Sequence, residues 1–203
     1  MNLPVLASGG KVEHMTPVVE YYRRWSKSDY LRMAQTGILA DGERTELFEG
    51  IILTRSPNNP PHANAVSRLT MLLTKHYFKH IVRVQLPLDV KGDSLPEPDF
   101  AIVKEDCIRP DAHPREAVLV IEVADSSLHY DRHEKSSLYA RSGIPEYWIL
   151  NIPDQVLEIY SEPAPDSEAS LGWGSRRRVV LSITEEASPL SLPDARLPVV
   201  GMF

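Results

Sequence analysis

The sequence predicts a mixed α/β (α+β) domain in which a central mixed sheet is flanked by helices. Short apolar runs, typical of buried strands, gather over residues 81–161 in the middle of the chain. A stretch with helical periodicity precedes them at residues 62–80, and a second one interrupts them at residues 131–142. This order of elements places one helix on each side of the sheet.

Size and composition are those of an ordinary globular protein. The chain has 203 residues, of which 42% are hydrophobic and 25% are charged, enough for one well-buried core. Its single cysteine, Cys107, excludes an internal disulfide and a cysteine-rich zinc site. No run approaches the roughly 18 apolar residues that span a bilayer, and the first residues lack the basic lead of a signal peptide. We therefore expect a cytoplasmic protein with no membrane partner.

The net charge limits the class of partner. It is −6, from 22 basic against 28 acidic residues, whereas proteins that bind nucleic acid mainly through its phosphates favour a basic surface. Indiscriminate binding to nucleic acid is therefore disfavoured. An enzyme that contacts nucleic acid over a small area and carries a cluster of metal-binding acids is compatible with this net charge.

The first part of the chain is predicted to hold a flexible segment and then a short helix. Residues 1–24 lack sustained periodicity, so we assign one domain to residues 25–203. Ser26 has the residue type of a helix N-cap, Asp29 completes a box-like spacing, and Gly37 can end the helix.

Strand and turn signals dominate the rest of the chain. Residues 43–56 indicate extended structure with a turn near Gly50, and residues 161–175 are polar enough to predict a loop. The helix over residues 131–142 is predicted to end at Gly143. The remaining strand candidates are residues 81–90, 97–103, 117–124, 146–151, 155–161 and 176–183.

Two of these strand candidates each carry one conspicuous acid, Asp99 and Glu122. An ionised carboxylate among apolar residues costs several kcal/mol unless it is protonated, paired with a cation or bound to a metal. If the two acids lie on adjacent strands, one must protonate unless a divalent ion sits between them. Oxygen ligands of this kind suit Mg²⁺, which can promote phosphodiester hydrolysis. The alternative is a salt bridge at a strand end or a protonated acid in the core.

A lysine on the following helix fits the same interpretation. Asp131, Lys135 and Tyr139 have the i, i+4, i+8 spacing of one helical face. An amine directed at the attacking water could orient it and offset charge in the transition state. The alternative is a surface ion pair between Asp131 and Lys135, which would contribute little.

These residues resemble the PD-(D/E)XK nuclease superfamily and, more narrowly, the bacterial Uma-two family of restriction-endonuclease-like proteins. The resemblance covers roughly residues 26–203, and its long central block is more specific than a lone short motif. The segments that carry it are "TELFEG", "PPHANAVSRL", "PLDV", "PEPDFAIV", "VLVIEVADSSLHYDRHEKSSLYARSGIPEYWILN" and "SPLSLPDARLPVVGMF".

The resemblance implies a restriction-endonuclease-like core and a role for each matched acid. Asp99 of "PEPD" matches the metal-binding aspartate, and Glu122 of "VIEVA" matches the acid of the (D/E)XK element. Glu46 of "TELFEG" matches an acid from the N-terminal half, although a solvated acid beside a turn is an equally good interpretation. The backbone carbonyl of Val123 is implied as a further metal ligand.

The chain departs from the superfamily pattern at the lysine. The superfamily places it two residues after the strand acid, where this sequence has Ala124. The resemblance therefore implies that the lysine has migrated to the helix, which makes Lys135 the candidate.

The function implied is that of a Mg²⁺-dependent endonuclease, with Mn²⁺ as a substitute, that hydrolyses DNA. A homodimer would be a natural arrangement for cutting both strands of a duplex. One alternative is a catalytically silent module of the same fold that binds nucleic acid or protein, which predicts that Lys135 points away from the two carboxylates. Hydrolysis of RNA or of a small phosphoester is a further alternative.

Histidines give weaker signals. His62, in "PPHAN", matches a histidine found in the family where the first long helix begins, and it is a minor candidate for a site role. The pairs His76 with His80 and His129 with His133 have metal-clasping i, i+4 spacing but bring no obvious third ligand, so we predict surface residues.

Overall fold

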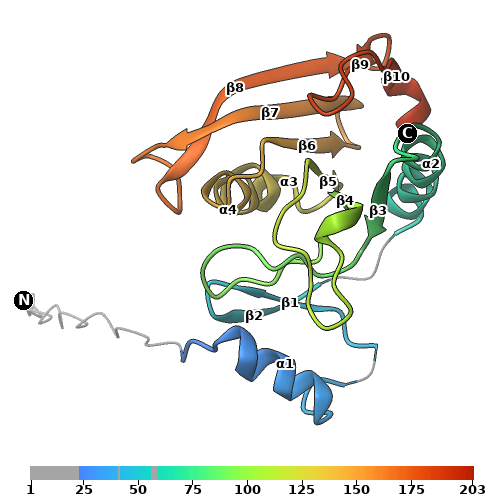
Figure 1. Cartoon of the computed structure of the whole chain (residues 1–203). Helices are drawn as coiled ribbons and strands as arrows, with labels where there is room; N and C mark the ends of the chain where they lie inside the picture. The colour runs from blue at the N-terminus through green and yellow to red at the C-terminus, as the bar shows by residue number, and fades with distance from the viewer. Residues whose placement is uncertain (1–22, 41, 56–58) are drawn as a thin grey trace, which may run out of the picture.

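The computed structural model describes residues 23–40, 42–55 and 59–203. Most of the segment predicted to be flexible, residues 1–22, lies outside the described residues. The centre of the fold is a six-stranded sheet in the order β3-β4-β5-β6-β7-β8 (Figure 1). Its strands are β3 (His80–Val84), β4 (Phe100–Lys104), β5 (Leu119–Ala124), β6 (Glu146–Asn151), β7 (Val156–Pro165) and β8 (Trp173–Ser182).

The predicted mixed sheet flanked by helices is confirmed. β5 and β6 run parallel, whereas the other neighbouring strands run antiparallel. The helices are α1 (Lys27–Gln35), α2 (Pro60–His76), α3 (Leu128–Tyr130) and α4 (Ser136–Arg141). None of the helices in the described ranges is long and apolar enough to cross a membrane.

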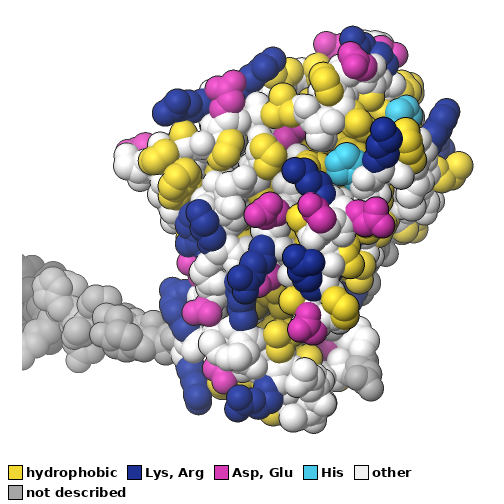
Figure 2. Space-filling view, viewed as in Figure 1, with side chains coloured by type: hydrophobic (Ala, Val, Ile, Leu, Met, Phe, Trp, Pro, Cys, Tyr) yellow, Lys and Arg dark blue, Asp and Glu magenta, His cyan; other side chains and the backbone are white. Residues whose placement is uncertain are grey.

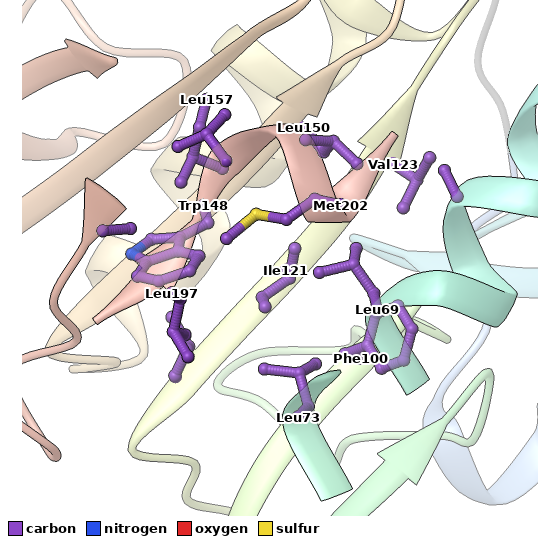
Figure 3. Packing of buried hydrophobic residues seen from close by; sticks show 14 of the residues in the cluster. Leu69, Leu73, Phe100, Ile121, Val123, Trp148, Leu150, Leu157, Leu197 and Met202 are labelled. Atoms are coloured by element: carbon purple, nitrogen blue, oxygen red, sulfur yellow. The ribbon is translucent and has the colours of Figure 1, made fainter. Parts of the chain in front are cut away.

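The two faces of the sheet are covered by different helices. On one face, Leu69 of α2 packs in a core with Ile121 of β5, which Figure 3 shows from close by. On the other face, Leu138 of α4 packs in a core with Val120. Because side chains alternate along β5, this strand contributes residues to both cores.

β5 is buried along its whole length, which explains its nearly unbroken apolar sequence. Its pairing with β4 ends where Ile121 faces Phe100. Glu122 is the next residue on β5, and Asp99 is the residue before β4. The sequence thus places its two acids where the paired strands part.

A smaller layer lies below the sheet in Figure 1 and consists of α1 and a hairpin of β1 (Thr45–Phe48) and β2 (Ile51–Thr54). Ser26 caps α1 as predicted, because its hydroxyl accepts a hydrogen bond from the Asp29 N–H at 3.1 Å. The expected turn at Gly50 has a φ of +78°, which glycine adopts without strain. Leu47 of β1 pairs with Leu95, which joins the hairpin to the segment before β4.

Several predicted elements need correction. The strand predicted over residues 81–90 ends at Val84, and the helix predicted over residues 62–80 ends at His76. The stretch predicted as one regular helix contains a π-helical turn, η2 (Asp131–Lys135), between α3 and α4. The loop predicted over residues 161–175 is shorter, because β7 runs to residue 165 and β8 starts at residue 173. β8 is an edge strand with many exposed residues, so polar side chains conceal its strand pattern.

The C-terminal segment returns to the core beside α2. It contains the short strand β9 (Glu186–Ala187), the strand β10 (Leu197–Pro198) and the 3₁₀ turn η3 (Val199–Met202). Leu197 and Met202 are fully buried and lie near Leu69 and Trp148 in Figure 3. A further 3₁₀ turn, η1 (Glu105–Cys107), follows β4.

Candidate active site

A cleft of about 390 Å³ opens where β4 and β5 part, between the end of β2, the start of α2 and η2. Its lining is rich in charge. The charged groups that line it are four carboxylates, Asp99, Glu122, Asp125 and Asp131, and two permanent cations, Arg55 and Lys135, beside His62. The excess of carboxylates makes this a favourable place for a cation.

The geometry of the strand ends holds the first two acids together. The Val123 N–H donates to Asp99 Oδ2 at 2.9 Å, and the Asp99 N–H donates to Glu122 Oε2 at 3.3 Å. Asp99 and Glu122 are only 1% and 2% exposed. The sequence argument needed these two acids on neighbouring strands, and the fold places them there.

Asp99 is held as an anion by its neighbours. His62 Nε2 lies 3.1 Å from Asp99 Oδ2, and the Gln85 amide donates to Asp99 Oδ1 at 3.0 Å. Burial opposes ionisation, but the interaction with His62 and the charge of Arg55 outweigh it and lower the pKa of Asp99 to about 2. Asn59 fixes His62 by capping α2, since its side chain accepts from the His62 N–H.

The negative charge of Glu122 is less fully compensated by its neighbours than that of Asp99. Glu122 Oε1 accepts from Lys135 Nζ and from the Tyr139 hydroxyl, both at 2.8 Å. Burial raises the pKa of Glu122 to about 7, and the Lys135 ammonium offsets this only in part, because Asp99 and Asp131 add like charge. Near neutral pH the neighbours of Glu122 therefore do not fully compensate its ionised form, and a further cation would stabilise it.

Lys135 is buried and charged. Burial disfavours its ammonium, but the attraction of Glu122 and Glu46 outweighs burial and holds the pKa of Lys135 above its usual value. Glu46 Oε2 lies 3.3 Å from Lys135 Nζ. Glu46 is itself buried and is not part of the cleft lining, so it supports the lysine from behind the cleft.

The lysine does not form the surface ion pair that was the alternative for it. Among the described residues, the ion pairs of Lys135 are with Glu122 and Glu46, whereas Asp131 accepts a hydrogen bond from Ser127 at 2.5 Å. The silent-module alternative predicted an amine that points away from the carboxylates. The amine instead contacts Glu122.

The π-helical turn aims two cations at two different strands. From η2, Lys135 reaches Glu122 of β5, and Arg132 reaches Glu158 of β7, with its Nε 3.1 Å from each carboxylate oxygen. π-Helical turns recur at functional sites. The helical pattern alone did not reveal this turn, and sequence reasoning also missed Glu158, which is fully buried.

Other residues of the site were missed because their role depends on contacts between distant segments. Arg55, just after β2, has its Nη2 3.8 Å from Asp99 Oδ1. Tyr139, noted only for its helical spacing, donates to Glu122. Nothing in the local sequence around Arg55 or Gln85 distinguishes either residue from an exposed polar side chain.

A hard cation would find three oxygen donors at the open end of the strands. Within the described part of the chain, Asp99 Oδ1 and Glu122 Oε2 each accept one hydrogen bond and so retain a free lone pair. The Val123 N–H points to Asp99, so strand geometry directs the Val123 carbonyl to the same edge of the strand, and Val123 lines the cleft. These donors fit Mg²⁺, which keeps several waters and needs few protein ligands.

The histidine pairs do not add a second centre. Across the described part of the chain, no group of three or more His, Cys, Asp or Glu side chains is arranged to hold a metal ion. His129 and His133 stack with ring centroids 4.4 Å apart. The donor set at the strand ends is of a different kind, because it combines two carboxylates with a backbone carbonyl.

A mixed sheet between helices, with paired acids and a lysine in a cleft where two strands part, defines a protein of the nuclease fold. The chain belongs to the Uma2 family, described as "putative restriction endonuclease", whose model matches residues 28–199. The resemblance seen in the sequence is thereby confirmed, and membership supports a nuclease-like function.

A solved structure supports the same fold. The crystal structure of a putative nuclease belonging to DUF820 from Anabaena variabilis is similar, with a TM-score of 0.66. The match covers 88% of this chain and 97% of that chain at 14% sequence identity. No curated protein matches the chain.

Proposed function

We propose that this protein is a metal-dependent endonuclease that hydrolyses phosphodiester bonds of DNA. The observation that carries the proposal is the meeting of Asp99, Glu122 and Lys135 in one cleft, with the lysine amine bonded to the strand acid. Family membership supports the same reaction class.

The donor set supports a requirement for Mg²⁺ or Mn²⁺. Asp99, Glu122 and the Val123 carbonyl would hold the ion. The chemistry that such an ion supplies is polarisation of a phosphoryl oxygen and a lower pKa for water. The raised pKa of Glu122 supports this assignment, because a buried carboxyl without enough cationic partners is one that a divalent ion would complete.

The chain's own residues then have distinct tasks. Lys135 carries a fixed positive charge into the cleft, where it can orient the attacking water and offset charge on the phosphate. Glu46 holds the Lys135 amine in place through an ion pair, and Tyr139 holds the Glu122 carboxylate through a hydrogen bond. His62 holds Asp99 and thus orients a metal ligand.

The surface charge supports local rather than extended contact with nucleic acid. Figure 2 shows acidic and basic side chains interspersed on the face that it views, and the described residues there form no continuous basic stripe. Cutting both strands of a duplex with one cleft per chain is simplest for a twofold dimer. We therefore expect a dimer, at least on the substrate, which light scattering with and without a DNA duplex would measure.

The test is cleavage of a panel of duplex DNA, single-stranded DNA and RNA with Mg²⁺ or Mn²⁺, by wild type and by Glu122→Gln. Glutamine keeps the shape and removes the charge, so we expect metal-dependent cleavage of DNA that is lost in the variant. Glu186→Gln, on the exposed side of β9, is the matched control and should cleave like wild type. Equal traces of cleavage by wild type and Glu122→Gln would place the activity elsewhere.

A silent module of this fold is the second candidate, and one observation favours it. The strand position where the superfamily carries its lysine holds Ala124, packed in the core. The module would bind nucleic acid or protein without cleavage. Absence of cleavage by folded wild type with either ion would reject the endonuclease and favour this function.

A further inference from the structure

Among the described cations of the cleft, Arg55 is the one without a carboxylate oxygen at hydrogen-bond distance. Its side chain is only 17% exposed, and its Nη1 donates to the Glu97 carbonyl. Within the described residues, its nearest carboxylate contact is the 3.8 Å separation from Asp99 Oδ1. Lys135, in contrast, has two carboxylates within 3.3 Å.

This arrangement leaves most of the guanidinium available. An arginine has five N–H donors in a planar fork, and the hydrogen bond of Arg55 to Glu97 uses one nitrogen. Because Arg55 lines the cleft, the remaining donors lie at the same opening as the two acids. A buried, permanently charged group in this state is suited to an anionic ligand.

The carboxylate oxygen nearest to Arg55 is also the one with spare capacity. Among the described residues, Asp99 Oδ2 accepts from His62 and from the Val123 N–H, whereas Oδ1 accepts a hydrogen bond only from Gln85. Oδ1 is therefore the oxygen assigned to the metal, and it is the atom that Arg55 faces. A divalent cation at Oδ1 and the guanidinium would repel each other across a short distance.

A phosphodiester resolves that conflict. Its non-bridging oxygens match the arginine fork and lie between two positive charges when one of them contacts the metal. The cleft is otherwise acidic, so a phosphate needs cations on its approach, and Lys135 is already engaged by Glu122 and Glu46. Among the described permanent cations of the cleft, Arg55 therefore remains for the phosphate.

We propose that Arg55 has two alternating partners: it neutralises Asp99 while the cleft holds no metal, and it binds a non-bridging oxygen of the substrate phosphate once a divalent cation occupies Asp99. This inference rests on the proposed function, because it takes Asp99 as a metal ligand. It makes Arg55 a substrate-binding residue that also competes with the metal.

The proposal predicts shifts of opposite sign in two affinities. Arg55→Gln keeps an N–H for the Glu97 carbonyl but removes the charge. We expect it to bind Mn²⁺ alone about threefold to tenfold more tightly, because a competing cation is gone. We expect it to bind a DNA duplex in Ca²⁺, which uses the same oxygen donors, about tenfold more weakly.

Calorimetry with Mn²⁺ and fluorescence anisotropy with labelled DNA measure the two affinities. Arg55→Lys keeps the charge but not the fork, so it should bind Mn²⁺ like wild type and DNA with intermediate affinity. Arg68→Gln makes the same charge change on the exposed side of α2 and should alter neither affinity appreciably. Intermediate DNA affinity of Arg55→Lys supports the proposal even if Arg55→Gln fails to fold. If Arg55→Gln binds DNA as tightly as wild type does, the proposal is overturned.

Other outcomes separate this inference from the function on which it rests. Weaker binding of both Mn²⁺ and DNA by Arg55→Gln, with a lower unfolding temperature, would show a structural role and overturn the inference alone. If wild type cleaves DNA but Arg55→Gln binds both ligands unchanged, the endonuclease stands and the role of Arg55 fails. If wild type binds no divalent ion, the metal site fails first and the inference with it.

Discussion

Two buried glutamates on the same face of the sheet, Glu122 and Glu158, have pKa values that are shifted in opposite directions. Glu122 on β5 is opposite Ile149 on β6, and Ile149 is opposite Glu158 on β7. Both side chains are almost inaccessible to solvent, at 2% and 0% exposed. Yet the pKa of Glu122 is raised to about 7, and that of Glu158 is lowered to about 2.

The difference lies in the partners. Burial raises the pKa of Glu158 as well, but hydrogen bonds outweigh it; the donors are Arg132, Tyr160, Arg178 and Asn151. Glu122 has one cation and one hydroxyl within 2.8 Å and lies beside further acids. Burial alone therefore does not mark a functional acid. An acid that the fold leaves short of positive charge is the better candidate.

The two glutamates are also joined through one element. Arg132 and Lys135 belong to the same π-helical turn, and each contacts one of the two acids. Glu158 thus anchors the turn that presents the lysine to Glu122. The comparison predicts that changes at Glu158 act on stability, whereas changes at Glu122 act on chemistry.

Removal of the two cations gives the largest expected contrast. Lys135→Met should lower the cleavage rate by about 100- to 10,000-fold, because the charge that we propose to assist the attacking water is lost. Its stability should fall little, since Glu122 can take up a proton. Arg132→Met should destabilise the fold by about 1–2 kcal/mol but retain cleavage. Single-turnover cleavage and urea denaturation measure the two effects, and similar cleavage rates for the two variants would contradict the distinct roles of Lys135 and Arg132.

Neutralising the acids themselves should separate their effects on stability. Glu158→Gln leaves Arg132 and Arg178 without their carboxylate and should lower the free energy of unfolding by about 2–3 kcal/mol. Glu122→Gln removes a charge that the fold tolerates poorly, so its free energy of unfolding should stay within about 1 kcal/mol of wild type. Urea denaturation at neutral pH without metal tests both, and equal losses would contradict the distinction.

The opposite pKa shifts predict opposite slopes of stability with pH in metal-free protein. Folded Glu122 keeps its proton to about pH 7, above the ordinary 4.5, so the folded state binds more protons between these values and stability falls as pH rises. Folded Glu158 stays ionised down to about pH 2, so its contribution is present above 4.5 and is lost as pH falls. We expect about 3 kcal/mol across each window, at about 1.4 kcal/mol per pH unit.

The two glutamine variants identify the source of each slope. Glu122→Gln should flatten the change between pH 4.5 and 7 and leave the acid side unaltered. Glu158→Gln should flatten the change between pH 2 and 4.5. Unfolding free energies measured at several pH values test this. If Glu122→Gln flattened the acid window and Glu158→Gln the neutral one, the two slopes would be assigned the other way round.

A matched pair of tyrosines gives the smallest effect. Tyr139 donates to Glu122 at 2.8 Å, and Tyr160 donates to Glu158 at 2.7 Å. Tyr160→Phe should cost about 1 kcal/mol of stability with cleavage unchanged, because one donor to a charged acid is lost. Tyr139→Phe should slow cleavage several-fold at similar stability. Unaltered cleavage in Tyr139→Phe would mean that Lys135 alone fixes the Glu122 carboxylate.

The sequence predicted the parts of the fold that local patterns encode. The apolar run of β5 is distinctive because both of its faces are buried, and Ser26 shows the cap of α1 through its residue type alone. The longer extent of β8 escaped prediction, since exposed side chains on an edge strand break the alternation of polar and apolar residues. The extra length of β7 escaped because two prolines, Pro163 and Pro165, lie in its last residues, where the sequence favours a loop.

The site was predictable where the family motif names its residues. Acids in apolar strands and a lysine on the next helix single out Asp99, Glu122 and Lys135, the motif assigns their roles, and the fold places the three side chains together. Their roles, and those of Glu46 and the Val123 carbonyl, stay predictions. Arg55 and Glu158 could not be chosen, because their significance comes from contacts with residues far away in the chain.

The position of Lys135 has a consequence for how this fold evolves. The amine reaches Glu122 from 13 residues further along the chain, while the strand position two residues after Glu122 holds the buried methyl group of Ala124. Selection on such a site would constrain where a nitrogen atom lies in space and leave its place along the chain free to drift. A relative whose lysine stood elsewhere along the chain would share no short linear signature with this protein. A spatial template of two carboxylates and an amine would find such a relative where a spaced sequence pattern fails.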